Sequence, residues 1–243
     1  MKKFALLFAA MLAMVQINAA AGEPAGDDEK TYQVSTPFSD DDESTKHWTV
    51  ETSGFYIGMG VDHSWEAINN SFEVGLLNIA ALNYNSLHGQ NISLGVGIHH
   101  RSYSIKRPLM LVREEGSSVV TTDFYPNQNV DKIKDRSSNL NMWAVQFPLM
   151  FNQKIYKKLS FSLGAIMDWN FKACVDNHYE LDKVEHDTRY NGLKQNKLTF
   201  DFMGGINLKA IGVYCRYSPS KFFKDGYGPE IKNTWTLGLV IGM

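Results

Sequence analysis

The sequence has few cysteines, no excess of basic charge and, after its N-terminal segment, no long apolar run. Its two cysteines, Cys174 and Cys215, are too few for a disulfide framework. The predicted strands that carry them are not adjacent, so we expect two unpaired thiols. The formal net charge of −2 gives no basic excess, so no nucleic-acid partner is expected. After the N-terminal segment no stretch approaches about 18 uninterrupted apolar residues, so hydropathy predicts no transmembrane helix in the mature chain.

Motifs for cofactor and metal chemistry are also scarce. The glycines lie within alternating segments at period two, which is the wrong context for a nucleotide phosphate loop. One segment, Asp176–Asp187, is rich in oxygen and imidazole ligands that suit a divalent cation. These are His178, Glu180, Asp182, Glu185, His186 and Asp187. Their spacing matches no known site, and a solvated acidic loop is favoured. We therefore expect no cofactor and no metal, and we assign no catalytic residue.

The first residues carry an export signal. Lys2 and Lys3 precede an apolar run from Phe4 to Ile17, interrupted only by Gln16, and small residues follow at 19–21. This pattern predicts a secretory signal peptide over residues 1–21. Residues 22–50 are predicted to be a disordered acidic lead in the periplasm, since eight acidic residues stand against Lys30 and Lys46 between Gly22 and Lys46. The remaining residues, 51–243, form the predicted folded domain.

From residue 54 onward the sequence alternates between apolar and polar or small residues. In GFYIGMGVDH, Phe55, Ile57, Met59 and Val61 share one face. Such alternation is typical of half-buried strands. It predicts eight strands, over residues 54–63, 71–86, 91–105, 141–151, 159–171, 198–207, 211–217 and 234–243. A bulge is expected where Asn78 interrupts the second strand, and a local distortion is expected at Pro148.

The predicted connections fall into two groups. One group is short and includes Leu87–Gln90, Gln153–Lys158 and Leu208–Lys209. The other includes three long, polar segments, Lys106–Ser138, Cys174–Lys197 and Pro219–Asn233. Short turns on one rim and long loops on the other are typical of outer-membrane barrels.

The small and charged residues indicate which face of the strands points inward. The polar phase is rich in glycine, which relieves crowding in the narrow interior of an eight-stranded barrel. The same phase carries charges of both signs, which can neutralise one another inside: Asp62, Glu73, Arg101, Asp168, Asp201 and Arg216. Four tryptophans, Trp65, Trp143, Trp169 and Trp235, are expected at the long-loop rim, as in an interfacial aromatic belt. The sequence therefore predicts an all-β fold, an eight-stranded antiparallel up-and-down transmembrane β-barrel with its apolar face outward.

Four segments resemble the PorT-like outer-membrane β-barrel family of Bacteroidota. They are GFYIGMGV, SLGVGIHHRSY, VQFPLMF and TLGLVIGM, and the resemblance covers about Ser53 to Met243. It implies the same barrel architecture and no single shared activity. Barrels of this kind commonly end in an aromatic residue, part of the signal read by the barrel assembly machinery, whereas this chain ends in Met243.

The expected function is structural or interactive and not enzymatic. The expected location is the cell outer membrane, with a narrow lumen filled by side chains. The partners are outer-membrane lipid and lipopolysaccharide, the assembly machinery, and another envelope protein bound through the long loops. Two alternatives stay open: a lipid-modifying enzyme and a soluble exported lipocalin-like ligand-binding barrel. The enzyme hypothesis rests on His100, Ser102 and Glu114, which resemble the His, Ser and Glu of lipid A deacylase barrels, although Tyr103 stands where that family has Asn.

Overall fold

The computed structural model describes residues 48–61, 66–85, 90–113, 117–124, 133–156 and 158–242. The described residues form these strands: β1 Trp48–Val61, β2 Ile68–Asn85, β3 Gln90–Ile105, β4 Leu109–Arg113, β5 Val120–Phe124, β6 Ile133–Tyr156, β7 Leu159–Leu181, β8 Val184–Asn191, β9 Leu198–Leu208, β10 Ile211–Ser218 and β11 Thr234–Ile241. No helix in these ranges is long and apolar enough to cross a membrane. The predicted signal peptide lies outside the described residues. The first strand begins at Trp48, inside the range predicted as the acidic lead.

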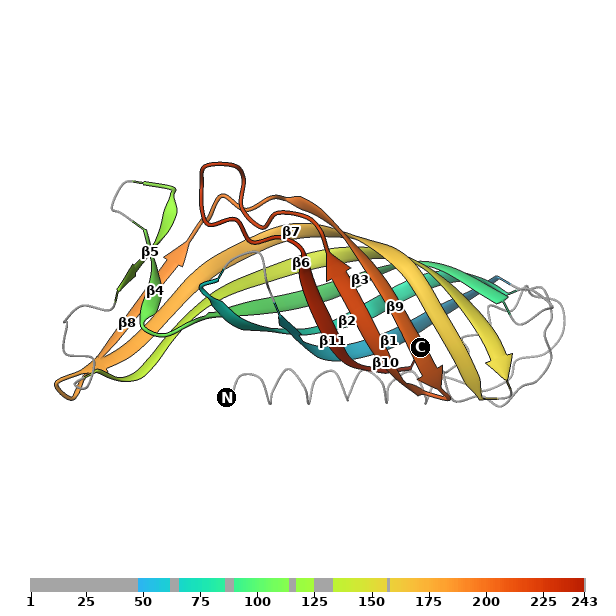
Figure 1. Cartoon of the computed structure of the whole chain (residues 1–243). Helices are drawn as coiled ribbons and strands as arrows, with labels where there is room; N and C mark the ends of the chain where they lie inside the picture. Colours follow the sequence, from blue (N-terminus) through green and yellow to red (C-terminus); the bar gives the residue numbers. More distant parts are fainter. Residues whose placement is uncertain are drawn as a thin grey trace, which may run out of the picture.

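Eight of these strands form a closed ring. The order around it is β1, β2, β3, β6, β7, β9, β10 and β11, and β1 pairs with β11 to close it. Each pairing in the ring is antiparallel. The ring leaves no unpaired edge, and its strands run up and down between two rims (Figure 1). The predicted eight-stranded antiparallel barrel is confirmed.

Two segments predicted as loops are instead largely β-structure. Lys106–Ser138 contains the β4–β5 hairpin and the start of β6, and Cys174–Lys197 contains the end of β7 and all of β8. The β7–β8 turn is formed by Asp182 and Lys183, both with positive φ, a two-residue hairpin turn usually signalled by glycine or asparagine. The prediction of a loop was wrong for β8 because polar or charged residues occupy both of its faces and the β7–β8 turn lacks glycine. It was wrong for β4 because that strand, although apolar, is only five residues long. Figure 1 shows β6, β7 and β8 extending beyond the rest of the ring.

Both predicted irregularities are present. The β2–β3 register shifts between Leu76 and Ala80, which brings Leu77 and Asn78 into the interior and leaves Ile79 half exposed. At Pro148 the register with β3 is kept, but the paired residues run from Leu149 directly to Gln146. The β3–β6 ladder is thus interrupted over two pairs, at Pro148, which has no N–H to donate, and at the adjacent Phe147.

The outside of the ring is apolar and the inside is small, polar or charged. Leu94, Leu163 and Leu239 are 57%, 60% and 52% exposed, whereas Asp168 and Arg216 are 1% and 0% exposed. The predicted direction of the faces is confirmed. Trp169 and Trp235, the tryptophans at the long-loop end of the exposed band, are 48% and 47% exposed. Trp65 and Asp62 lie outside the described residues.

The interior is filled in three layers. Near the short-turn rim, a cluster led by Tyr56, Leu77, Met150 and Val240 fills the ring. A layer of charged side chains follows. Toward the long loops lies a larger apolar cluster: Ala67, Ile68, Tyr103, Ile105, Leu111, Val120, Leu140, Met142, Ala173, Val175, Leu193, Phe222, Phe223 and Ile231. The sequence reading expected a polar lumen and did not anticipate these apolar layers.

Candidate functional site: a closed lumen and a polar outer wall

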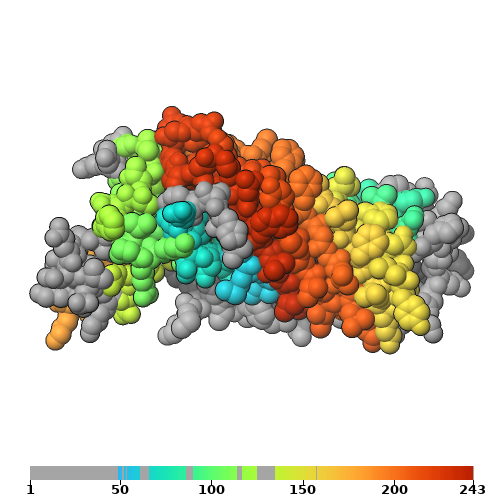
Figure 2. All heavy atoms as spheres, viewed as in Figure 1, coloured from blue at the N-terminus to red at the C-terminus, as the bar shows by residue number. Residues whose placement is uncertain are grey.

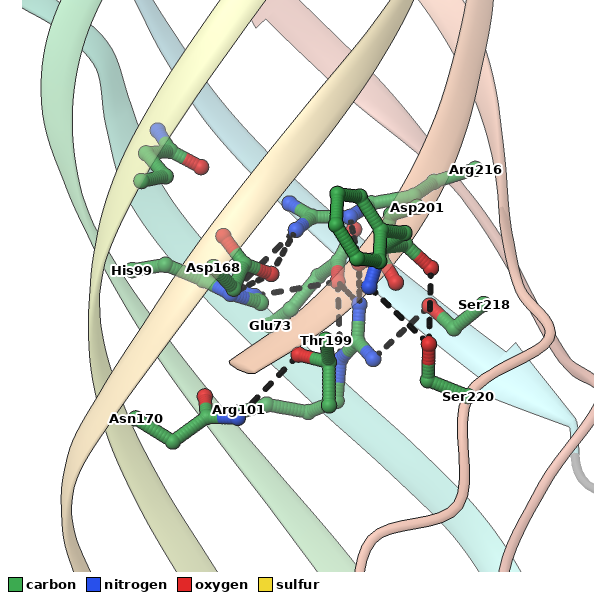
Figure 3. A network of polar contacts seen from close by, with 12 residues as sticks. Glu73, His99, Arg101, Asp168, Asn170, Thr199, Asp201, Arg216, Ser218 and Ser220 are labelled. Carbon is green, nitrogen blue, oxygen red and sulfur yellow. Dashed lines mark hydrogen bonds and ion pairs between the residues drawn. The ribbon is translucent and has the colours of Figure 1, made fainter. Parts of the chain in front are cut away.

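Arg216 lies at the centre of the charged layer (Figure 3). Its Nη2 lies 2.6 Å from Asp168 Oδ2, and its Nε lies 2.6 Å from Asp201 Oδ2. Its Nη1 donates to the Tyr56 hydroxyl at 3.0 Å. The residue is on β10, so one side chain connects groups from β1, β7 and β9 across the ring.

Arg101 on β3 makes a second set of bonds beside the first. Its Nη2 lies 2.8 Å from Glu73 Oε2 and 3.2 Å from Asp201 Oδ2. Its Nη1 donates to Ser218 Oγ at 2.9 Å. Asp201 Oδ2 therefore accepts from both guanidinium groups, which joins the two sets into one network.

His99 and two tyrosines complete this network. His99 Nε2 lies 3.3 Å from Glu73 Oε2, and His99 Nδ1 lies 3.5 Å from Asp168 Oδ2. Tyr214 donates to Glu73 Oε1 at 2.8 Å. Tyr56 donates to Gln146 Oε1 at 2.9 Å, and Gln146 Nε2 donates in turn to the Leu76 carbonyl.

The charges in the network nearly balance. Three carboxylates, Glu73, Asp168 and Asp201, stand against the two guanidinium groups, so the formal charge is −1 with neutral His99 and zero with a protonated ring. Buried charges are tolerated only when they are paired and hydrogen-bonded, as they are here. This arrangement can hold strands together and block the lumen.

A lid of loop segments covers the long-loop end of the lumen. Phe222 and Phe223 pack in the upper apolar cluster with Leu111 and Val120 of the β4–β5 hairpin. Backbone bonds fix this lid, from Val120 N to Tyr227 O and from Phe222 N to Ile231 O. Figure 2 shows the red segment that precedes β11 lying against the green β4–β5 segment. The segment predicted as a free loop over Pro219–Asn233 is thus packed onto the barrel.

The two described residues of the enzyme hypothesis, His100 and Ser102, are partly or wholly covered. His100 lies under the ring of Trp143, with centroids 4.6 Å apart, and is 7% exposed. Ser102 is half-buried and pairs with Asn141 of β6. Glu114 lies outside the described residues. The cover over His100 is unfavourable for a base that must reach a lipid ester.

The acidic segment Asp176–Asp187 forms part of the β7–β8 hairpin. His178 Nδ1 and Asp187 Oδ1 are 2.6 Å apart, and this hydrogen bond raises the pKa of His178 above its usual value. His186 stacks on Tyr179. Within the described part of the chain, no three His, Cys, Asp or Glu residues are grouped so that they could hold a metal ion. Cys174 and Cys215 are both free thiols, as predicted.

Sequence reasoning found the charged members of the network but not its partners. Glu73, Arg101, Asp168, Asp201 and Arg216 were predicted to share the interior, and they do. The roles of His99, Tyr56, Tyr214 and Gln146 were missed. Their position on the inward phase was a usable signal, because a polar group facing a charged interior must find a partner there.

Comparison with known proteins gives a distant likeness to solved structures. No family model matches the chain, and no curated protein matches it. Two structures of Ail, the attachment invasion locus protein of Yersinia pestis, are similar to it. One is in complex with the heparin analogue sucrose octasulfate, with 12% identity, 79% of this chain and 96% of that chain covered, and a TM-score of 0.32. The other has 10% identity, coverage of 78% and 98%, and a TM-score of 0.26.

Proposed function

We propose that this chain is an outer-membrane β-barrel with a closed lumen, whose structural or interaction role is carried out by the strands and loops beyond its aromatic belt. One observation carries the proposal: every strand of the ring exposes large apolar side chains, while ion pairs are buried inside. The outward residues include Met59, Leu82, Leu94, Leu149, Leu163, Phe202, Val213 and Leu237, which are between 46% and 67% exposed. A continuous apolar band on a closed ring suits hydrocarbon and not water.

The same band argues against a soluble exported ligand-binding barrel. Such a barrel keeps its apolar residues inside and its polar residues outside. Here the interior is occupied by Arg216, Tyr56, Met150 and their neighbours. A lipid-modifying enzyme is disfavoured by the Trp143 ring over His100.

The proposed partners follow from the position of the polar parts. Lipid surrounds the band, and lipopolysaccharide surrounds the outer wall above it. Another envelope protein would meet the β4–β5 hairpin, the lid or the β7–β8 hairpin. The barrel assembly machinery would insert the chain. Membership of the PorT-like family stays a prediction from the sequence.

Fractionation and gel migration test the proposal together. The expected result is recovery in the detergent-soluble outer-membrane fraction, with faster migration of unheated than of boiled protein, since a closed barrel resists detergent until heated. A matched pair of variants separates lipid contact from general damage. Leu163→Asp, on the outward face, should lower the yield of inserted barrel, whereas Lys209→Asp, at an exposed turn, should not. Recovery of the unmodified chain in the soluble fraction would contradict the proposal.

A further inference from the structure

The outer wall of the barrel contains a cavity of about 470 Å³ beside the long-loop rim. Three cationic and three polar residues line it: Lys106, Arg107, Arg136, Asn69, Ser104 and Ser137. Ile105 completes the lining, and no described residue of this lining is acidic. The cavity is thus rich in donors and positive charge.

The alternation of β3 places this cavity on the outside of the ring and not in the lumen. Leu94 and Val96 are exposed on the outward phase of this strand, and Ser104 continues the same phase. Tyr103 and Ile105, on the other phase, are buried in the upper apolar cluster. A molecule in the cavity would therefore lie against the wall that faces the membrane.

The cationic groups are held close together by the chain. Lys106 and Arg107 follow directly after β3, and Arg136 lies on the neighbouring β6. Arg107 Nε donates to the Arg136 carbonyl at 3.1 Å, which fixes the Arg107 guanidinium against the backbone of β6. Two carboxylates of the neighbouring β7–β8 hairpin are engaged elsewhere, Asp176 with Arg189 at 3.2 Å and Asp187 with His178 at 2.6 Å.

The height of the cavity matches a lipid headgroup. Trp143, near the polar limit of the apolar band, pairs with His100. From His100 to Ser104 the strand rises about 13 Å, or roughly 10 Å along the normal of a barrel whose strands tilt by about 40°. The headgroup layer begins at the edge of the hydrocarbon and extends over a comparable distance.

We propose that this cavity binds a phosphate group of a membrane lipid headgroup. The inference rests on the proposed function, because it needs the outer wall to stand in a membrane. Arginine forks match phosphate oxygens in geometry and charge, and the serine hydroxyls and asparagine amide supply neutral donors. The bound lipid would fix the depth and rotation of the barrel in the outer leaflet.

Native mass spectrometry of the full chain in a neutral detergent tests this, with phosphatidic acid as the probe and phosphatidylcholine as the reference. The variant Lys106→Gln, Arg107→Gln, Arg136→Gln removes the three charges. We expect it to bind phosphatidic acid on the order of a hundredfold more weakly, since each cation near an anionic lipid contributes about fivefold. The control Lys183→Gln, Lys194→Gln, Lys224→Gln changes the total charge equally, at exposed long-loop positions outside the cavity. It should bind as the unmodified chain does.

The remaining outcomes are also decisive. Equal binding by the two triple variants overturns the proposal. So does inorganic phosphate or a heparin fragment that binds as tightly as phosphatidic acid, because the ligand would then not be a lipid. Heat-modifiable migration is measured on the same samples. A normal shift without a difference in lipid binding removes only the lipid site, whereas loss of the shift in the unmodified chain removes the membrane barrel as well.

Discussion

At the scale of single residues, Arg216 is the group whose loss has the largest expected effect. Replacement by Met would leave Asp168 facing only the His99 ring in a fully enclosed site. Removing one partner of a buried ion pair typically costs about 3–5 kcal/mol of unfolding free energy. We expect Arg216→Met to lower the urea midpoint for unfolding of the refolded barrel. Tryptophan fluorescence measures this midpoint. Asp168→Asn in the same chain should restore part of the loss.

Arg189→Met is the matched control for that experiment. Arg189 also pairs with an aspartate, Asp176 at 3.2 Å, but its side chain is 54% exposed. An exposed pair contributes about 0–1 kcal/mol. Equal destabilisation by the two substitutions would show that the central network does not stabilise the barrel.

A second prediction concerns glycines that differ only in their surroundings. A Cβ on Gly97 would meet the carbonyl oxygens of Leu76 and Leu77, where the β2 bulge brings the backbone close. A Cβ on Gly204 would find its nearest neighbour, Leu163 Cδ1, at 3.5 Å. Gly97→Ala should therefore lose about 1–3 kcal/mol of unfolding free energy. Gly204→Ala should leave the same urea midpoint within error, and a similar loss in both variants would contradict this explanation.

At this scale the sequence identified charges better than contacts. Alternation was enough to place Arg101, Asp168 and Arg216 in the interior. It did not show that Asp201 bridges both arginines or that Tyr214 meets Glu73, because the Arg101–Asp201 and Tyr214–Glu73 contacts join strands far apart in sequence. Which inward side chains meet depends on the stagger of the strands around the ring. A single sequence does not determine that stagger.

At the scale of elements, the β7–β8 hairpin is expected to respond to pH. The folded pKa of His178 is raised by Asp187, so the pair contributes fully below the ordinary histidine pKa of about 6.5. Its contribution is lost as the pH rises through the raised value. Both side chains are well exposed, so the change is at most about 1 kcal/mol. Amides of β8 should exchange faster at high pH than the intrinsic rate predicts.

Asp187→Asn is the comparison for the hairpin. The amide keeps a hydrogen-bond acceptor but removes the charge that favours protonated His178. Its β8 amides should show only the intrinsic dependence on pH. A pH response unchanged by this substitution would place its cause outside the His178–Asp187 pair.

Strands that face lipid on one side were predictable, whereas strands that face water on both sides were not. The strands with Leu94, Leu163 and Leu239 carry a clear apolar phase, and each was placed correctly. In β8, Val184–Asn191, a charged or polar residue occupies most positions on both faces. Only its pairing with β7 defines it, and composition gives no sign of that pairing. The bulge at Asn78 was predictable because it breaks an otherwise clear pattern.

At the scale of the whole molecule, we expect the barrel not to conduct ions. The lumen is blocked at three levels, by the lower apolar cluster, by the Arg216 network and by the Phe222–Phe223 lid. Planar-bilayer recordings should show no steady channels for the unmodified chain. They should also show none for Arg216→Met or for a chain in which residues 221–231 are replaced by a short Gly-Ser linker, since two barriers remain in each.

Even the combined change leaves one barrier. The linker variant that also carries Arg216→Met and Asp168→Asn should stay silent, because the lower apolar cluster still fills the ring near the short-turn rim. Conduction by this variant would show that the lower cluster alone does not close the lumen. Conduction by the unmodified chain would contradict the closed lumen.

In the proposed outer-membrane orientation, the tall hairpin of β6, β7 and β8 also determines how visible this molecule is from outside a cell. Beyond Trp169, β7 continues to Leu181, which is about 40 Å of strand. Its tip would then extend beyond the headgroups and the innermost sugars, to a height at which antibodies and phages can bind it. A peptide tag inserted between Asp182 and Lys183 would mark living cells without touching the wall below, which makes this turn a natural place to display foreign sequence.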